Sequence, residues 1–193
     1  MSPFVERLIG RLPVRDTRPS DDGRRRAGVA AVVHDDPAGH HGPRVLMMVR
    51  IQRDGDPWSG HISLPGGGYQ HADGDLRITA IRETHEEMGV DLTVPAIRFI
   101  GPLPPVSPVS AGPMGVEVTP FVFATAEPVE PTPGPEAVAA FWLPLELAAS
   151  GKLDSSYTYP GTDRVFPSWS FEGHTIWGLT WRILTDLLAS GRG

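Results

Sequence analysis

One stretch, from Leu64 to Val90, limits what this chain can fold into more than any other; it reads LPGGGYQHADGDLRITAIRETHEEMGV. It begins with a proline and three glycines, whose missing Cβ atoms let the backbone approach a ligand closely or adopt positive φ. Asp73 and Asp75 then offer side-chain oxygens for a helix N-cap. The residues from 76 to 88 include no proline or glycine, and Gly89 follows where a helix-ending glycine is expected. The stretch predicts a glycine-rich turn that leads directly into a helix.

Three glutamates, Glu83, Glu86 and Glu87, stand at i, i+3 and i+4 on this helix, so their side chains share one face. Like charges at this spacing destabilise an isolated helix by a few tenths of a kcal/mol, which suggests that a cation lies between them. Oxygen ligands at this density suit Mg²⁺ or Mn²⁺, which keep waters and bridge to substrate phosphates. The opposite face carries apolar side chains that we expect to pack into a core: Ile78, Ile81 and Met88.

Arg82 adjoins the three glutamates, and its guanidinium can hold one carboxylate in place by a forked ion pair. A solvated acidic helix face is the simpler interpretation of such a cluster. The glycine-rich turn directly before the helix favours a metal and phosphate site instead.

This stretch resembles the Nudix box, whose pattern is G-x5-E-x7-R-E-U-x-E-E-x-G-U, where U is an apolar residue. RETHEEMGV at residues 82–90 matches the second half, with Thr84 at an apolar position. The first half differs, because the position due a glutamate, counted back from Arg82, is Gly74. Counting forward from Gly67 reaches Asp73 instead, as if one residue were inserted. This variant is similar to the box of the coenzyme A pyrophosphatase branch of Nudix hydrolases.

The resemblance implies an α/β protein with the Nudix fold, in which a mixed β-sheet lies between α-helices (α/β/α). It covers roughly Ala27 to Leu188. We expect one domain over residues 1–193, with an N-terminal helix and loop at 1–26 and a core at 27–190. The implied cofactor is Mg²⁺ or Mn²⁺.

Site roles follow from the same resemblance, position by position. Gly67 would offer a backbone carbonyl to the metal, and the helix glutamates would supply the carboxylates: Glu83, Glu86 and Glu87. The implied catalytic residues are Arg82, Glu83 and Glu136. Glu83 is a candidate general base, in competition with Glu117 or Glu136. For each of the last two, a plain surface glutamate is the alternative interpretation.

Residues upstream and downstream of the box bear on the substrate. Arg50 and Arg53 are candidate phosphate-binding groups, and Trp58 is a candidate for stacking on a base. A solvated strand end and a packed tryptophan are the respective alternatives. HTIWGLT at residues 174–180 resembles the I-W-G-x-T element of coenzyme A pyrophosphatases, and its expected role is to dock the last helix. Tyr157 and Tyr159 either line a substrate pocket or cover the sheet.

Composition excludes several classes of function. The net charge of −6 argues against a nucleic-acid binder that works by phosphate neutralisation. The absence of cysteine excludes disulfides, thiolate zinc sites and a cysteine nucleophile. No segment approaches the roughly 20 apolar residues of a membrane span, and no signal-peptide core is present. We expect a cytoplasmic monomer or homodimer that binds a nucleotide-containing small molecule.

Hydrophobic patterns predict the remaining elements. Strands are expected at 27–33, 44–50, 96–101 and 116–126, where Pro120 indicates an edge strand or a bulge. Residues 137–145 fit either a strand or the start of a helix. A hairpin is expected to turn at Glu172 and Gly173. Helices are expected at 2–12 and 177–190.

Three functions are compatible with this sequence. The first is hydrolysis of the pyrophosphate bond of coenzyme A or an acyl-coenzyme A, favoured by the shifted box and the I-W-G-x-T element. The second is hydrolysis of another nucleotide, such as ADP-ribose, a nucleoside triphosphate or a dinucleoside polyphosphate. The third is a non-catalytic Nudix-fold regulator. Such regulators usually lose box acids, and here the three helix glutamates and Arg82 remain.

Overall fold

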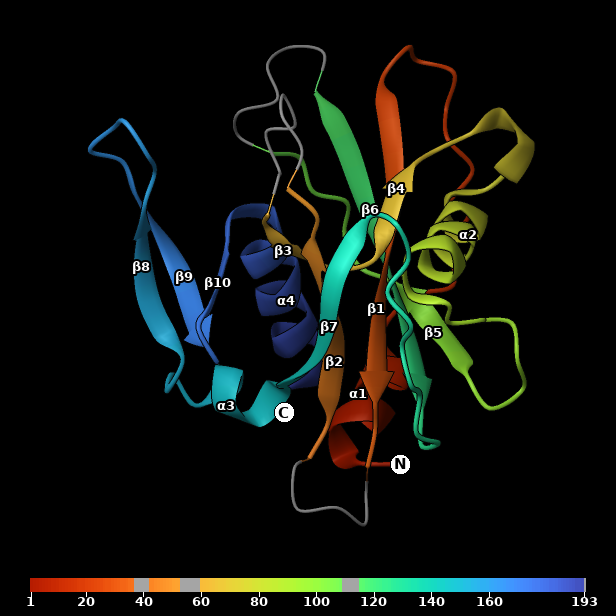
Figure 1. The fold of residues 1–193 in the computed structure, drawn as a ribbon. Coiled ribbons are helices and arrows are strands. Elements are labelled where there is room, and N and C mark those ends of the chain that lie inside the picture. The colour runs from red at the N-terminus through yellow and green to blue at the C-terminus, as the bar shows by residue number, and fades with distance from the viewer. Residues whose placement is uncertain (37–41, 53–59, 109–114, 193) are drawn as a thin grey trace.

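The computed structural model describes residues 1–36, 42–52, 60–108 and 115–192. Figure 1 shows a central sheet with helices on both faces and a small second sheet at one side. The elements, in chain order, are α1 (Pro3–Arg11), β1 (Arg25–His34), β2 (Arg44–Arg50), β3 (Ile62–Ser63), β4 (Gly66–Gly68), the 3-10 helix η1 (His71–Asp73), α2 (Leu76–Met88), β5 (Arg98–Pro102), β6 (Val116–Thr125), β7 (Ala137–Pro144), α3 (Leu145–Ala149), β8 (Asp154–Thr158), β9 (Val165–Phe171), β10 (His174–Trp177) and α4 (Gly178–Gly191).

The central sheet is mixed, with the order β3-β2-β1-β6-β5 and with β7 added along β2. β1 and β6 run parallel from Arg25 to His34, and the other described pairs are antiparallel. Among the described residues, the pairing of β1 with β2 is limited to Val33 and His34 of β1. Beyond that point the two strands part, and β3 pairs with β2 while β4 pairs with β1. The glycine turn therefore lies in a fork of the sheet.

Alternate residues of β1 serve two hydrophobic cores. Ala31 and Val33 pack in a cluster with residues of α1 and α4, whereas Ala30 and Val32 pack with Leu76, Ala80 and Met88 of α2. The predicted α/β/α arrangement is confirmed. α2 approaches β1 so closely that a Cβ added at Gly28 would lie 2.2 Å from the Leu76 carbonyl oxygen, which explains the glycine.

Most predicted elements are confirmed within a few residues. Ser2 caps α1 by accepting a hydrogen bond from the Val5 N–H, and β9 and β10 form the predicted hairpin, with positive φ at Glu172 and Gly173. The ambiguous segment 137–145 is the strand β7, which runs into α3. None of the described helices is long and apolar enough to cross a membrane.

Two expectations need correction. Of the two alternatives for Pro120, the edge strand is wrong, because β6 has β1 on one side and β5 on the other, although the pairing of β5 with β6 shifts register between Phe99 and Gly101. The proline stands just beyond the last β5 pair, where its carbonyl accepts a hydrogen bond from the Leu103 N–H. Ile78 is 40% exposed, although Met88 is fully buried and Ile81 packs at the edge of the core. Thr79, Ala80 and Thr84 take the buried positions on α2, which places the inward face beside the one expected.

Candidate functional site

The main chain of the glycine turn contacts glutamate side chains in the C-terminal half of α2. Gly66 has φ of 150°, and its N–H donates a hydrogen bond to Glu87 Oε2 at 2.8 Å. A Cβ added at Gly67 would lie 2.6 Å from the Glu83 carboxyl group, so only glycine lets this carboxylate lie against the turn. Two of the three helix glutamates thus touch the glycine backbone directly.

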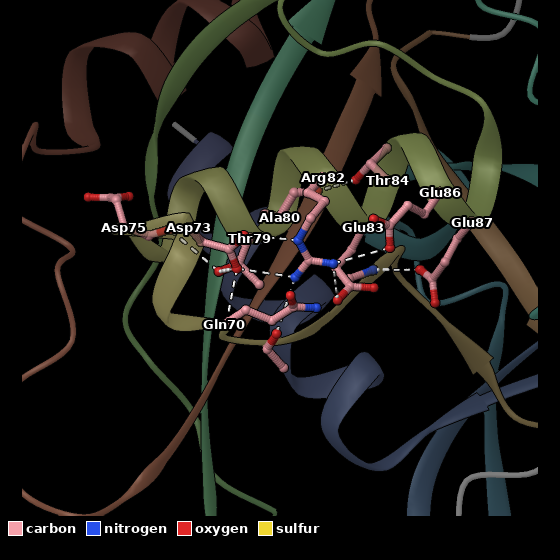
Figure 2. Close-up of polar contacts among 12 residues, drawn as sticks. Gln70, Asp73, Asp75, Thr79, Ala80, Arg82, Glu83, Thr84, Glu86 and Glu87 are labelled. Carbon is pink, nitrogen blue, oxygen red and sulfur yellow. Dashed lines mark hydrogen bonds and ion pairs between the residues drawn. The ribbon is translucent and has the colours of Figure 1, made fainter.

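Arg82 organises the other half of the site (Figure 2). Its Nε and Nη2 donate to the two carboxylate oxygens of Asp73 at 2.9 and 3.1 Å, which is the forked ion pair that the sequence predicts. Its Nη1 donates to Glu83 Oε1 at 2.8 Å and to Glu86 Oε2 at 3.1 Å. Nη2 also reaches the Gly68 carbonyl oxygen at 3.3 Å. One guanidinium therefore links three carboxylates to the glycine turn.

Asp73 resolves the irregular first half of the box. Thr79 Oγ1 and the Gln70 N–H donate to its Oδ2 at 2.8 and 3.0 Å, in addition to the Arg82 fork. Gly74 then turns the chain with φ of 69°, and Asp75 caps α2 by accepting from the Arg77 N–H at 2.7 Å. The aspartate reached by counting forward from the glycines is the acid that meets the arginine.

Thr84 stands at a box position that usually holds an apolar residue. It is fully buried, and its hydroxyl donates to the Ala80 carbonyl oxygen at 2.6 Å. A buried hydroxyl that is satisfied within its own helix costs little, so this departure leaves α2 intact. At the end of the helix, Gly89 adopts a left-handed conformation with φ of 64°, as predicted.

The carboxylates differ sharply in their electrostatic surroundings. Glu87 is 2% exposed, and its burial raises its pKa to about 7, although the Gly66 N–H and the positive charge of Arg50 oppose the shift. Burial also raises the pKa of Glu83, with the Arg82 guanidinium acting in the opposite direction. The hydrogen bond to Arg82 lowers the pKa of Asp73 to about 2. The Glu86 side chain is 57% exposed.

The loop before β7 places a further acid near these groups. The Gly134 N–H donates to the Glu87 carbonyl and the Thr132 N–H to the Met88 carbonyl, both at 2.8 Å, so this loop completes the end of α2. The Ile51 N–H donates to the Glu136 carbonyl at 3.0 Å. The negative charge of Glu136 contributes to the raised pKa of both Glu83 and Glu87, so Glu136 lies near enough to act on both carboxylates.

Not every predicted residue joins this arrangement. Glu117 forms an ion pair with Arg26 Nε at 3.1 Å, which gives it a structural partner on the neighbouring strand. Arg53 and Trp58 lie outside the described residues. The roles assigned to all these residues from sequence stay predictions.

The donor set fits a hard divalent cation. It offers three carboxylates and the glycine backbone, all oxygen ligands, around the buried Glu87. Within the described ranges, no three His, Cys, Asp or Glu side chains are already gathered as a metal cluster. Arg82 explains this, because it draws Glu83 and Glu86 toward itself while Glu87 bonds to Gly66. Mg²⁺ commonly uses only one or two carboxylates and keeps its waters, so a preformed cluster is not required.

Sequence reasoning missed two features of the site. The hydrogen bond from Gly66 to Glu87 joins residues 21 positions apart, and only the length of the glycine run hinted at it. The contribution of the loop before β7 to the end of α2 left no local signal, because Gly134 stands in a proline-rich segment without periodicity.

Comparison with known proteins identifies the family to which the chain is similar. The family model of the NUDIX domain matches residues 24–161. A Schizosaccharomyces pombe protein, C14C4.10c, is 48% identical over 61 residues, which cover 32% of this chain and 18% of that protein. The Nudix hydrolase NudL of Salmonella paratyphi B is 34% identical over 135 residues, or 67% of this chain and 66% of NudL. The chain thus spans less than two thirds of either relative.

A solved structure shows the shared fold over most of the chain. The NUDIX hydrolase of Alicyclobacillus acidocaldarius superposes with a TM-score of 0.57 at 18% identity and covers 88% of this chain and 93% of its own. The family match begins at the start of β1 and ends beyond β8, so it contains the glycine turn, α2 and the loop before β7. On this evidence, the chain belongs to the Nudix family.

Proposed function

We propose that this protein is a metal-dependent pyrophosphohydrolase that cleaves the pyrophosphate bond of a nucleoside diphosphate linked to another group. One observation carries the proposal: the buried Glu87 and the partly buried Glu83 converge on the glycine turn, and the hydrogen-bonded Arg82 stands beside them. A buried carboxylate is costly unless a cation compensates it. A divalent cation with substrate phosphate is the partner that this oxygen-rich pocket suits.

Glu83, Glu86, Glu87 and the Gly67 carbonyl are the groups that would hold the metal. Bound Mg²⁺ or Mn²⁺ supplies positive charge to the pyrophosphate oxygens and activates water for attack at phosphorus. Water adds to one phosphorus, the bridging P–O bond breaks, and two phosphate monoesters leave.

The residues of the chain hold the metal-binding carboxylates in position and accept the proton of the attacking water. Arg82 fixes the Glu83 and Glu86 carboxylates, and Asp73 in turn fixes Arg82. Glu83 is the first candidate to accept the proton of the attacking water, because its carboxylate lies against the turn that would carry the phosphates. Glu136 is the second candidate, since its charge is felt at both Glu83 and Glu87. We expect Arg50 to stabilise negative charge on the departing phosphate, because its charge already acts on Glu87.

The substrate we favour is coenzyme A or an acyl-coenzyme A, which would yield phosphopantetheine and adenosine 3′,5′-bisphosphate. Its support is the resemblance of the shifted box, in which Asp73 takes the place of the first glutamate, and of the I-W-G-x-T element at residues 176–180. The name of the NudL relatives specifies a Nudix hydrolase and no substrate. Fold alone does not choose among nucleotides.

The test is product analysis with coenzyme A, ADP-ribose and a nucleoside triphosphate, each with Mg²⁺ and with Mn²⁺. Release of phosphopantetheine and adenosine 3′,5′-bisphosphate from coenzyme A, at a higher kcat/KM than for the other two, is the expected result. Turnover of ADP-ribose or a triphosphate instead would discard coenzyme A and retain the hydrolase. Binding without turnover of any of them would identify a regulatory module and overturn the proposal.

A further inference from the structure

A cluster of aromatic side chains surrounds Trp177 at the end of β10. The Tyr157 ring stacks on Trp177 with centroids 4.2 Å apart and planes at 24°. Phe166 and Tyr159 approach the same indole at 5.6 and 5.9 Å, and His61 meets it edge-on at 5.2 Å. We refer to these five residues as the Trp177 cluster. Tyr157, Phe166 and Trp177 come from the strands of the small sheet, Tyr159 directly follows β8, and His61 directly precedes β3.

The Trp177 cluster occupies one face of the small sheet. Tyr157 pairs with Phe166, and Ser168, two residues further along β9, pairs with Trp177, so these side chains share a face. The other face supplies Trp169 and Ile176 to the main core. Tyr157, Phe166 and Trp177 therefore lie on the face of the small sheet opposite the one that packs into the main core.

The rings of the Trp177 cluster remain accessible. Tyr159 is 44% exposed, and the other four side chains are half-buried, in contrast with the fully enclosed Ile176 of the same sheet. Aromatic side chains that are held rigidly by their neighbours but keep an exposed surface are the usual platform for a planar ligand.

The cluster continues directly from the candidate site. β10 lies against β3 (Figure 1), and the Arg50 N–H donates to the His61 carbonyl at 3.0 Å. Arg50 is also close enough to Glu87 for its charge to act on that carboxylate. Arg50 is thus linked to both parts, because its N–H bonds to the main chain of His61 and its charge acts on Glu87. Along the chain, His61 is five residues before Gly66, a reach of at most about 18 Å.

We propose that the Trp177 cluster is the subsite that binds the purine base of the substrate. The base stacks on the accessible rings around Trp177 while the linked phosphates extend past Arg50 to the glycine turn. This inference rests on the proposed function, because it places the nucleoside half of that substrate. Tyr159 is 44% exposed, and its hydroxyl is the polar group that we expect to meet a base nitrogen or the ribose.

Binding of mononucleotides tests the subsite without any turnover. AMP, titrated into the metal-free protein, is expected to quench tryptophan fluorescence, whereas ribose 5-phosphate, which lacks the base, is not. Trp177→Phe should abolish the AMP-dependent quench. Trp181→Phe is the matched control, because Trp181 lies on α4 against Trp169 and outside the cluster. An equal quench in wild type and Trp177→Phe, or none with AMP, would overturn the inference.

A second variant separates binding from folding. Tyr159→Ala removes an exposed ring and should weaken AMP binding, and raise KM for the hydrolysed nucleotide, by about 5- to 100-fold, with kcat nearly unchanged. Val165→Ala on β9 is its control, since this side chain is 62% exposed and lies one residue from Phe166, on the other face. Unchanged AMP binding and KM in a folded Tyr159→Ala protein would also reject the subsite.

The base subsite and the hydrolase activity can each be rejected without rejecting the other. Hydrolysis of a nucleotide without any effect of Trp177→Phe or Tyr159→Ala would reject the base subsite and leave the hydrolase. A base-dependent quench in a protein that hydrolyses nothing would retain the subsite and reject the hydrolase.

Discussion

Two acidic side chains at opposite ends of the same helix have opposite electrostatic fates. Asp73, just before α2, receives the forked guanidinium of Arg82, and this lowers its pKa to about 2. Glu87, in the last turn of α2, receives one main-chain hydrogen bond from Gly66, and burial raises its pKa to about 7. Both are largely withdrawn from water.

The two carboxylates differ in the source of the positive charge that compensates them: for Asp73 it is part of the protein, and for Glu87 we expect it to come from a ligand. Asp73 has a cation built into the protein, so its negative charge is compensated in every state of the site. Among the described contacts, Glu87 has the neutral Gly66 donor, and the charge of Arg50 opposes its raised pKa only in part, so much of its desolvation cost is left for a ligand to offset. We interpret the Asp73 end as scaffold and the Glu87 end as the place where a divalent cation enters.

Among these substitutions, Glu87→Gln should have the largest effect on turnover, because it tests whether Glu87 is the carboxylate that needs the metal. The amide keeps the shape and can still accept the Gly66 N–H, but it removes the charge that we expect to hold the metal. Turnover should fall by more than about 100-fold, beyond what loss of a supporting residue costs. Steady-state kinetics of nucleotide hydrolysis measure this, with Glu6→Gln on the exposed side of α1 as the control. Full activity of Glu87→Gln in folded protein would refute the site.

Metal binding should be visible as stability, independently of turnover. Mg²⁺ at 100 times its Kd should stabilise the wild-type protein by about 2.7 kcal/mol, which corresponds to about 5–10 °C in Tm. The stabilisation should be largely lost in Glu87→Gln and retained in Asp75→Asn. Thermal unfolding at matched ionic strength with NaCl measures the effect. A rise in Tm that NaCl reproduces equally would indicate screening of charge and no specific site.

Local signals allowed the helix and its ends to be predicted. The Asp75 cap and the left-handed Gly89 each depend on a few neighbouring residues, and the structure confirms both. The predicted positions of Ile78 and Pro120 were wrong because tertiary contacts determine them. The buried face of α2 depends on how the helix packs on β1, which leaves Ile78 exposed. β6 has a neighbouring strand on each side, so Pro120 is not at an edge. The sequence could not show whether a strand would lie at an edge.

The site was only partly predictable for a related reason. The acidic face and Arg82 are adjacent in sequence, so their proximity follows from helix geometry alone. The choice between Asp73 and Gly74 needed the turn conformation, which only the structure supplies. The Trp177 cluster joins residues from 61 to 177, and no periodicity connects positions so far apart.

Asp73→Asn tests whether Asp73 supports the site by holding Arg82 in place. Arg82 would keep its contacts with Glu83 and Glu86 but lose its charged fork, so the two carboxylates would be held less firmly. Turnover should fall by roughly 10- to 100-fold, the usual cost of removing a supporting partner, and metal affinity should weaken within the same range. Asp75→Asn is the matched control two residues away. It alters the helix cap and the hydrogen bonds that Asp75 accepts from the Thr17 hydroxyl, at a cost of about 1 kcal/mol or less, and should leave kcat intact. Equal kinetics for the two variants would show that the fork is dispensable.

The smallest expected effect is on acid stability. Because the pKa of Asp73 lies below its ordinary value of 3.8, its ion pair stabilises the folded protein fully above that value and is lost as pH falls toward 2. By pH 3 the loss should be about 1 kcal/mol. Urea unfolding of metal-free protein between pH 6 and pH 3 measures it, as the difference between wild type and Asp73→Asn, which lacks this titration. The gap between the two should therefore narrow on acidification. A gap that stays constant would mean that Arg82 and Asp73 are not paired in solution, and the contrast between a permanently compensated carboxylate and an exchangeable one would have to be abandoned.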